Sequence, residues 1–313
     1  MRIFITGGTG FIGQHLVRQL SKEGHELFVL ARSQVMGNKL SAENVKIIFG
    51  DINNCDSYRR VFDNNIEVVY HLAAVAGNWK KVKRSYYYKT NVQATEELLK
   101  ASYDRIKKFV YCSSMSASEM MIASGGEYSR SKKEAEEKVI EYEKKGLTTL
   151  IIRPAIVYGP GDLGPVYKIC QLVKKGLTFV IGSGKNLLPL VYIDDLIKVF
   201  VTAGLEKEAG IREVVGPSES FENIIKVIAK DIQVKFRIIK IPKIFAWSAA
   251  WLIENLYKAF NQEPLLTRQR VAVLTSDINS EDQRLNVPHE RPMTNFGEGI
   301  KKTINWYQEN GYL

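Results

Sequence analysis

One glycine-rich run near the amino terminus constrains the fold more than any other feature of this sequence. The run is Thr6-Gly7-Gly8-Thr9-Gly10-Phe11-Ile12-Gly13. It follows an apolar segment that predicts a strand, Arg2 to Thr6, and opens a segment with helical periodicity, Phe11 to Glu23. A helix that begins there presents unpaired N–H groups and a partial positive charge. The run therefore predicts a turn that binds the pyrophosphate of a dinucleotide.

The three spaced glycines of this turn have separate tasks. Gly7 permits the tight turn, Gly10 lets the backbone approach the pyrophosphate, and Gly13 lets the helix pack on the strand. The alternative is a glycine turn without a ligand. The cofactor contacts expected from the turn come from Gly7, Thr9, Gly10, Phe11, Ile12 and Gly13.

The rest of the first half alternates apolar strands with amphipathic helices, which predicts a parallel sheet covered on both faces. Six or seven parallel strands fit. After Pro154 the rhythm breaks at glycine-rich turns. We expect an α/β fold with a Rossmann doubly wound sheet in residues 1–157, to which 186–216 returns, and a smaller, intertwined substrate-binding region in 158–185 and 217–313. The expected strands are Glu26–Ala31, Val45–Phe49, Val68–Leu72, Lys108–Ser113 and Thr148–Arg153, with helices at Asn91–Tyr103 and Ser129–Lys144.

Composition narrows the class of protein but leaves its partner open. The 313 residues are 45% hydrophobic and 25% charged, which is typical of a globular chain. No apolar run approaches the roughly 18 residues of a membrane span, and three scattered cysteines indicate reduced thiols. We expect a cytoplasmic protein without an integral membrane segment or a metal. The net charge of +10 fits nucleic acid, an anionic membrane or a phosphate-bearing ligand.

The residues after the second and third strands bear on the choice of cofactor. An acidic residue after the second strand would bind the ribose 2′-hydroxyl of NAD, whereas a cation there can hold a 2′-phosphate. Arg32 occupies this position, so the sequence predicts NADP. NAD remains possible if Arg32 is a solvated cation or stacks on adenine. Asp51, followed by Ile52, is placed to reach the adenine amino group or to cap the next helical segment.

A tyrosine and a lysine four residues apart form the candidate catalytic pair. Tyr128 and Lys132 share one face of a predicted helix, where the ammonium would lower the pKa of the phenol from about 10. Tyr103 and Lys107 have the same spacing but precede the strand that ends at Ser113 and Ser114. Because active-site groups collect at the carboxyl ends of parallel strands, Tyr128, Lys132 and Ser114 are the predicted catalytic residues. The alternative is a solvent-facing pair and a strand-end serine.

Together these motifs occur in the order typical of one family. They include the glycine turn, Asp51, His71-Leu72-Ala73-Ala74, Asn91, Ser114, Tyr128 with Lys132, and Arg153-Pro154 followed by Val157-Tyr158-Gly159. The chain resembles the extended short-chain dehydrogenase/reductases, the NAD-dependent epimerase/dehydratase superfamily. Its motifs are closest to the branch of 3β-hydroxysteroid dehydrogenases and dihydroflavonol reductases.

The resemblance implies roles for these residues. Ser114 and Tyr128 would hold the substrate oxygen, Lys132 would also bind the nicotinamide ribose, and Tyr128 would pass a proton as hydride moves. The cofactor would also contact Leu72, Ala73, Ala74, Asn91, Ser113, Pro154 and Val157.

The expected activity is NADP-dependent oxidation or reduction of a secondary alcohol or ketone. A nucleotide-sugar epimerase or dehydratase that recycles its cofactor is one alternative, and a non-catalytic NADP-binding sensor is another. The substrate is a small molecule, either anionic or apolar, and nucleic acid is not expected. Family members commonly pair as homodimers through a four-helix bundle, here Asn91–Tyr103 and Ser129–Lys144.

Two further segments have more than one interpretation. Residues 79–89 mix cations with aromatic side chains, and we expect a solvated loop or a contact with an anionic substrate. Residues 244–260 predict an amphipathic helix. We expect it to cap the substrate with its aromatic side chains in the core, and contact with a membrane surface is the alternative.

Overall fold

The computed structural model describes residues 1–38, 40, 42–77, 83–119, 126–176, 178–260, 267–268, 271 and 293–313. Two compact units make up the chain. The first comprises Met1–Asn78, Val82–Pro154 and Leu196–Glu213. The second includes Ala155–Asp195 and Val214–Leu313. Each unit has its own elements and core.

A seven-stranded sheet forms the centre of the first unit. Its strands lie in the order β11-β6-β5-β4-β1-β2-β3, and each neighbouring pair from β3 to β6 is parallel. This is the strand order of a Rossmann fold with one strand added, so the predicted fold class is confirmed. The strands are β1 (Arg2–Thr6), β2 (Glu26–Ala31), β3 (Val45–Phe49), β4 (Val68–His71), β5 (Lys108–Cys112), β6 (Thr148–Pro154) and β11 (Gly210–Val214).

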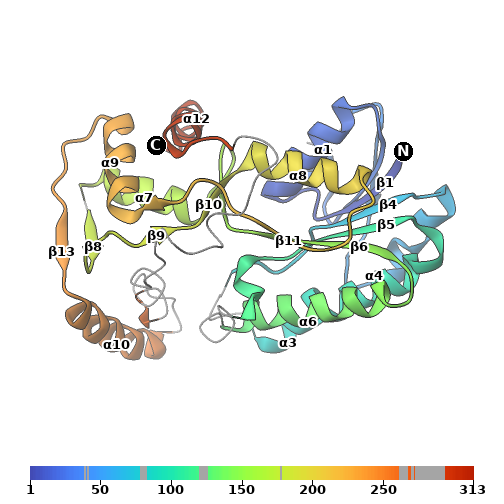
Figure 1. Ribbon diagram of the computed structural model, residues 1–313, viewed down its shortest axis with the longest axis horizontal. Coiled ribbons are helices and arrows are strands. Elements are labelled where there is room, and N and C mark those ends of the chain that lie inside the picture. The colour runs from blue at the N-terminus through green and yellow to red at the C-terminus, as the bar shows by residue number, and fades with distance from the viewer. Residues whose placement is uncertain are drawn as a thin grey trace. The chain divides into compact units, whose positions relative to one another are not determined.

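Helices cover both faces of this sheet (Figure 1). On one side lie α1 (Phe11–Lys22) and α8 (Ile193–Leu205), and on the other lie α4 (Ala94–Ser102) and α6 (Gly126–Glu143). Strands β1 and β4 to β6 are almost entirely buried, because apolar side chains point from them to both layers. The core between the sheet, α4 and α6 contains aromatic residues such as Phe4, Tyr58, Phe62, Phe109 and Tyr111.

The helical segment before α4 begins earlier than predicted. Arg84–Tyr87 is helical (α3), and a π-helical turn (η3) follows over Tyr88–Gln93. The prediction of a loop is therefore wrong for residues 84–89, while residues 79–82 lie outside the described residues. The buried Tyr87 anchors this segment, because its hydroxyl donates to the carbonyl of Gly77 at 2.6 Å. A π-helical turn is rare in proteins and often marks a functional site.

Short helical elements connect the strands of the first unit. They are α2 (Gln34–Asn38) and the 3₁₀ turns η1 (Cys55–Ser57), η2 (Arg59–Asn64), η4 (Tyr103–Arg105) and η5 (Met115–Ala117).

The second unit combines two-stranded sheets with helices. Its strands are β7 (Ile156–Tyr158), β8 (Phe179–Ile181), β9 (Leu187–Leu188), β10 (Leu190–Tyr192), β12 (Glu219–Ser220) and β13 (Ile239–Ile241). Its helices are α7 (Pro165–Lys174), α9 (Phe221–Ile232), α10 (Lys243–Phe260) and α12 (Phe296–Glu309). None of the described helices is long and apolar enough to cross a membrane.

Helix α10 differs from its prediction. It forms where the pattern places it, but the aromatic side chains expected in the core are exposed, including Phe245, Trp247 and Trp251. The two small residues Ala246 and Ala250 are buried in their place.

Candidate functional site

The parallel register brings the carboxyl ends of the strands to one edge of the sheet. Thr6 at the end of β1 pairs with Leu30 in β2 and with His71 in β4, and His71 pairs with Tyr111 in β5. The segments that follow these strands therefore share this edge. They carry the glycine turn, Arg32, Asp51, Leu72 to Ala74, Ser113 and Ser114. Pro154 ends β6 in the first unit, and Val157 lies on β7 in the second.

The glycine turn is closely packed at two of its three spaced glycines. Gly7 has a φ of 73°, and a Cβ atom there would lie 2.5 Å from the amide nitrogen of Ala73. A Cβ atom on Gly13 would lie 2.1 Å from the carbonyl oxygen of Gly7. Neither position accepts a side chain. These glycines hold the turn against the end of β4 and hold α1 against the turn.

The start of α1 is open in the way a diphosphate site requires. Gly10 is the N-cap residue of α1, and within the described chain no side chain caps the helix. Its neighbours Thr9, Phe11 and Ile12 are half-buried. Free backbone N–H groups at a helix start bind anions, so the turn fits the pyrophosphate of a dinucleotide.

The residues expected near the adenosine lie on exposed or half-buried loops. Arg32 is exposed, and no carboxylate of the described residues forms an ion pair with it. Asp51 Oδ1 accepts hydrogen bonds from the backbone and side-chain nitrogens of Asn53, at 2.8 and 3.0 Å. This is an Asx turn rather than a cap on η1. Ile52 is 6% exposed and packs in the core, so only its backbone is available to a ligand.

Ser114, Tyr128 and Lys132 meet beyond the end of β5. Ser114 accepts hydrogen bonds from the amide and the hydroxyl of Ser116, at 3.2 and 3.0 Å. It also forms a hydrogen bond with Tyr128. Lys132 is 2% exposed, and its ammonium donates to the carbonyl of Cys112 at 2.6 Å and to the hydroxyl of Tyr111 at 3.0 Å. Ser114 and Tyr128 are thus hydrogen-bonded to one another, and Lys132 follows Tyr128 by one helical turn with its ammonium held at the end of β5.

The predicted direction of the Tyr128 pKa is wrong for this structure. Burial raises the pKa of the phenol, and the hydrogen bond with Ser114 only partly offsets that effect. Burial also lowers the pKa of Lys132 to about 8, against the opposing influence of Cys112 and Glu136. Burial therefore governs both pKa shifts, and Lys132 is not among the groups that act on the pKa of Tyr128.

A chain of buried polar groups lies behind Lys132. The Tyr111 ring sits 4.4 Å from the ammonium, and its hydroxyl is also hydrogen-bonded to Thr95. Thr95 donates to the carbonyl of Asn91 at 2.7 Å, so it must accept from His71 Nε2 at 2.8 Å. His71 Nδ1 then accepts from the Thr6 hydroxyl at 2.6 Å. This network assigns a neutral His71 with its proton on Nε2.

The environment of His71 agrees with a neutral ring. The side chain is fully buried, and burial together with the Lys132 cation lowers its pKa to about 3. The imidazole therefore stays neutral at physiological pH and links β1 to the helical layer.

Asn91 organises the loop after β4. Its side-chain oxygen accepts from the amide of Val75 at 2.8 Å, and its side-chain nitrogen donates to the carbonyl of Val75 at 3.1 Å and to Ser131 at 2.9 Å. The side chain lies on the π-helical turn and is 1% exposed. Asn91 thus ties the loop that carries Leu72 to Ala74 to the helix that carries Tyr128.

A buried ion pair that was not predicted holds α6 on the sheet. Glu136 is fully buried and accepts from Arg153 Nε at 2.8 Å, from Arg153 Nη2 at 2.7 Å and from the Ser113 hydroxyl at 2.5 Å. Glu136 follows Lys132 by four residues, as Lys132 follows Tyr128. This spacing was the available signal, because residues four apart share one helix face.

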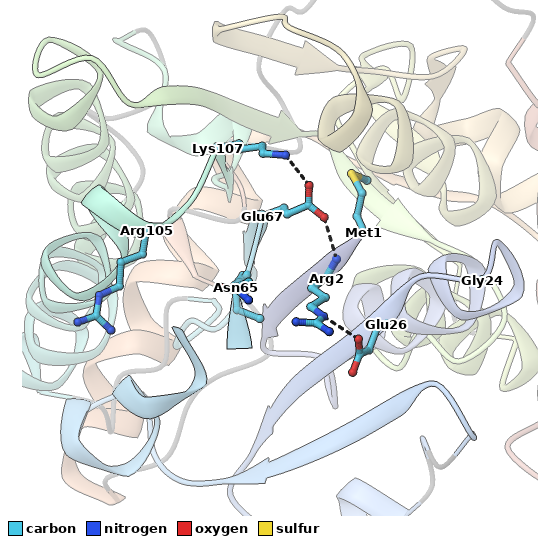
Figure 2. Close-up of a pocket in the computed structure, with 9 residues that line it drawn as sticks. Met1, Arg2, Gly24, Glu26, Asn65, Glu67, Arg105 and Lys107 are labelled. Carbon is cyan, nitrogen blue, oxygen red and sulfur yellow. Dashed lines mark hydrogen bonds and ion pairs between the residues drawn. The ribbon is translucent and has the colours of Figure 1, made fainter. Parts of the chain in front are cut away.

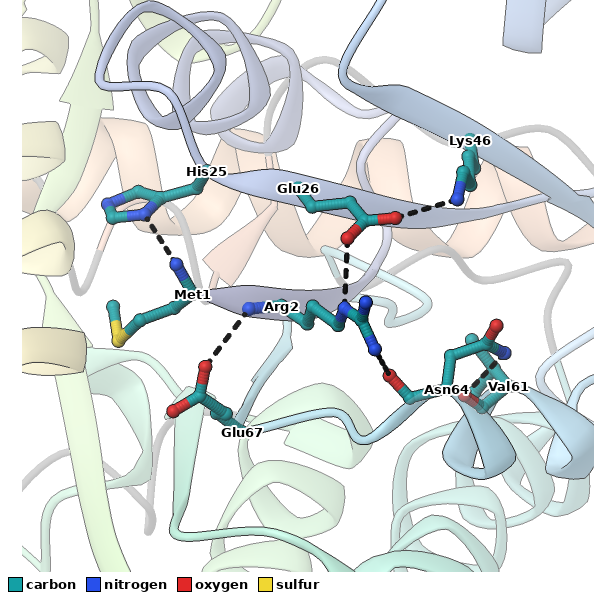
Figure 3. Close-up of polar contacts among 8 residues, drawn as sticks. All are labelled: Met1, Arg2, His25, Glu26, Lys46, Val61, Asn64 and Glu67. Carbon is teal, nitrogen blue, oxygen red and sulfur yellow. Dashed lines mark hydrogen bonds and ion pairs between the residues drawn. The ribbon is translucent and has the colours of Figure 1, made fainter.

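A hollow lies at the edge of the same sheet where the strands begin (Figure 2). Its volume is about 660 Å³, and its lining includes Met1, Arg2, Glu26, Glu67 and Lys107. Several of its charges are paired. Arg2 pairs with Glu26 at 2.9 Å (Figure 3), and Lys107 pairs with Glu67 at 2.7 Å (Figure 2). Ligands of open α/β sheets bind at the carboxyl ends of the strands, so this hollow at the amino ends is not the candidate site.

Comparison with known proteins identifies relatives of this chain. The model of the NAD dependent epimerase/dehydratase family matches residues 3–216. A putative dihydroflavonol 4-reductase from Synechocystis sp. is 22% identical over 99% of this chain and 95% of its own length. A 3beta-hydroxysteroid-dehydrogenase/decarboxylase from Arabidopsis thaliana (isoform 2) is 27% identical over 96% of this chain and 61% of its own length.

Solved structures share the fold. The structure of the UDP-glucose 4-epimerase of Thermus thermophilus in complex with NAD superimposes with a TM-score of 0.71, at 20% identity, over 98% of this chain and 99% of that one. The chain therefore belongs to the NAD dependent epimerase/dehydratase family and is an enzyme of the extended short-chain dehydrogenase/reductase type.

Proposed function

We propose that this enzyme uses NADP to interconvert a ketone and a secondary alcohol, with Ser114, Tyr128 and Lys132 as its catalytic residues. The observation that carries the proposal is the hydrogen-bonded cluster of Ser114 and Tyr128 at the strand edge that also carries the glycine turn. NADP supplies the hydride or accepts it when bound. NAD is the alternative cofactor.

The cofactor would lie along the carboxyl edge of the sheet. The amide groups at the start of α1 would hold its pyrophosphate, because that helix start is uncapped within the described residues and its glycine packing excludes side chains. Arg32 would pair with the 2′-phosphate, since it is exposed at the end of β2. Asp51 Oδ1 already accepts two hydrogen bonds from Asn53, so Asp51 Oδ2 would accept from the adenine amino group.

The side chains at the end of β5 would handle the substrate oxygen. Ser114 would donate a hydrogen bond to that oxygen, and Tyr128 would give it a proton during reduction or take one during oxidation. The proton transfer needs the phenol and the substrate oxygen within hydrogen-bond reach, which the partial exposure of Tyr128 permits. Lys132 would bind the ribose hydroxyls through its ammonium, whose carbonyl and hydroxyl acceptors hold it in place.

The decisive experiment measures NADPH consumption with a panel of ketones. We expect Tyr128→Phe to lower kcat by roughly 10²- to 10⁴-fold, because it removes the acid–base group. Tyr103→Phe is the matched control: Tyr103 precedes Lys107 by the same four residues, but its hydroxyl donates to the carbonyl of Lys145 away from β5's end. Equal activity of wild type and Tyr128→Phe would overturn the assignment.

The cofactor that copurifies with the protein distinguishes the proposed oxidoreductase from the alternative activity. A nucleotide-sugar epimerase or dehydratase would copurify with tightly held NAD and show no net NADPH consumption. Mass spectrometry of the ligands released from the purified protein distinguishes that outcome from NADP.

A further inference from the structure

Helix α10 presents its large apolar side chains to the outside and its small ones to the core. Ala246 and Ala250 are at most 2% exposed and pack with Ile181, Ile241 and Val271. The opposite face carries six large apolar residues with exposures between 48% and 71%: Ile244, Phe245, Trp247, Trp251, Leu252 and Leu256. We call these six residues the outer face of α10.

This arrangement is the reverse of a helix that only packs on a core. Single exposed leucines are common on proteins, but six large apolar side chains on one side of a helix mark a contact surface. At 100° per residue, the six side chains fall within one half of the helix circumference, together with Ser248 and Asn255, and Ala246 and Ala250 lie in the other half. The face therefore requires an apolar partner.

The segment that leads into the outer face is predominantly basic. Lys235, Arg237, Lys240 and Lys243 precede the helix or begin it, and all four are exposed. Of these cations, Lys240 pairs with Glu222 at 2.9 Å. Between residues 233 and 257 the single acidic residue is Glu254, whose carboxylate accepts from Arg268 at 3.0 Å and from the Arg268 amide at 2.7 Å. A partner that matches this segment has an apolar interior that accepts the outer face and a negatively charged surface that faces the cations.

We propose that α10 docks the protein on an anionic lipid bilayer, lying in the plane of the interface with its outer face among the acyl chains. Tryptophan and tyrosine favour this depth, and the cations of the segment that leads into the helix favour anionic headgroups. The helix does not meet the requirements of a membrane span. A second copy of this chain would offer the same positive charge, whereas anionic lipid offers the complementary one. The proposal does not depend on the proposed hydride transfer.

Vesicle flotation with the full-length protein tests this proposal. We expect binding to vesicles of phosphatidylcholine with phosphatidylglycerol, weaker binding to phosphatidylcholine alone, and loss of binding as salt rises. The double variant Phe245→Ser/Trp251→Ser should bind at least tenfold more weakly. The matched control is Leu205→Ser, which removes an equally exposed leucine (55%) from α8 in the first unit. The charge variant Lys235→Glu/Arg237→Glu should weaken binding to anionic vesicles by about tenfold.

Three results would overturn the proposal. One is the absence of wild-type binding to anionic vesicles, and another is equal binding by wild type and Phe245→Ser/Trp251→Ser. The third is a lower melting temperature of that variant together with dissociation of a dimer in sedimentation, because a second copy would then cover the outer face. An unchanged melting temperature supports the proposal, since the substituted side chains are more than half exposed.

Discussion

The buried ion pair between Glu136 and Arg153 provides a direct test of how α6 is positioned. Glu136→Gln removes the negative charge but keeps the size of a side chain that accepts three hydrogen bonds. Breaking a buried pair from one side costs about 3–5 kcal/mol, because the remaining charge loses its partner. Arg153 keeps a second carboxylate, Glu213, at 3.3 Å. We therefore expect Glu136→Gln to lower the free energy of unfolding, measured by urea denaturation, by about 3 kcal/mol, which is the lower end of that range.

The same substitution should affect catalysis through α6. Glu136 lies one turn after Lys132 and two after Tyr128 on the same helix. Loosening that helix should lower kcat more than it changes KM for the cofactor, because the phenol loses its fixed position relative to Ser114. The double variant Glu136→Leu/Arg153→Met should recover much of the free energy of unfolding that Glu136→Gln loses. Well-packed apolar residues can replace a buried ion pair at little cost in stability.

The control for this prediction lies on the same helix. Glu141 pairs with Lys138 at 3.2 Å, and half of its side chain is exposed. Glu141→Gln should change the free energy of unfolding by less than about 1 kcal/mol. If Glu136→Gln is no more destabilising than Glu141→Gln, the claim that this pair holds α6 on the sheet is refuted.

Four further predictions follow from the same geometry. Arg32→Glu should lower kcat/KM for NADPH by about 10- to 100-fold and change that for NADH much less, because one charge-assisted contact is lost; equal losses with both cofactors would contradict the assignment. His71 has a folded pKa of about 3 against 6.5 in the unfolded chain, so the unfolded chain binds the proton first as pH falls below 6.5. The contribution of His71 to the free energy of unfolding is therefore complete above pH 6.5 and is about 2 kcal/mol smaller at pH 5. In urea denaturation between these two pH values, His71→Gln should lose about 2 kcal/mol less than the wild type. Activity should fall above about pH 8 as the Lys132 ammonium loses its proton, and Tyr111→Phe, which removes one of its acceptors, should move this limb to lower pH by roughly one unit; an unmoved limb would exclude the role of Tyr111. We also expect a homodimer, which a 35.5 kDa species in sedimentation at micromolar concentration would exclude.

Local patterns made the Rossmann core predictable. Each of the six strands from Arg2 to Pro154 was placed within one residue, because period and turn residues are properties of neighbouring positions. The glycine turn was equally visible. Six or seven strands and a return of residues 186–216 to this region were expected, but Gly210–Val214 was not itself identified as the seventh strand, since it joins the sheet from far along the chain.

The candidate site shows the same division. Ser114, Tyr128 and Lys132 were chosen because parallel strands end at one edge. Ser114 and Tyr128 are hydrogen-bonded there, and the Lys132 ammonium is held at the end of β5. The pKa of Tyr128 could not be predicted, because the spacing of two residues contains no information about how deeply the fold buries them. Glu136 escaped notice because its partners, Ser113 and Arg153, come from two different strands.

The sequence by itself determined the elements, the glycine turn and the residue types available for chemistry, because these depend on neighbours within a few positions. Tertiary structure alone decided which groups are desolvated, which partner each donor finds, and which face of a helix is turned outward. Asn91 and helix α10 are examples. The side-chain amide of Asn91 holds the loop at Val75, and α10 exposes the aromatic side chains that were expected in the core. Burial and hydrogen bonding depend on segments that are distant in sequence, and these set the free energies on which the chemistry depends.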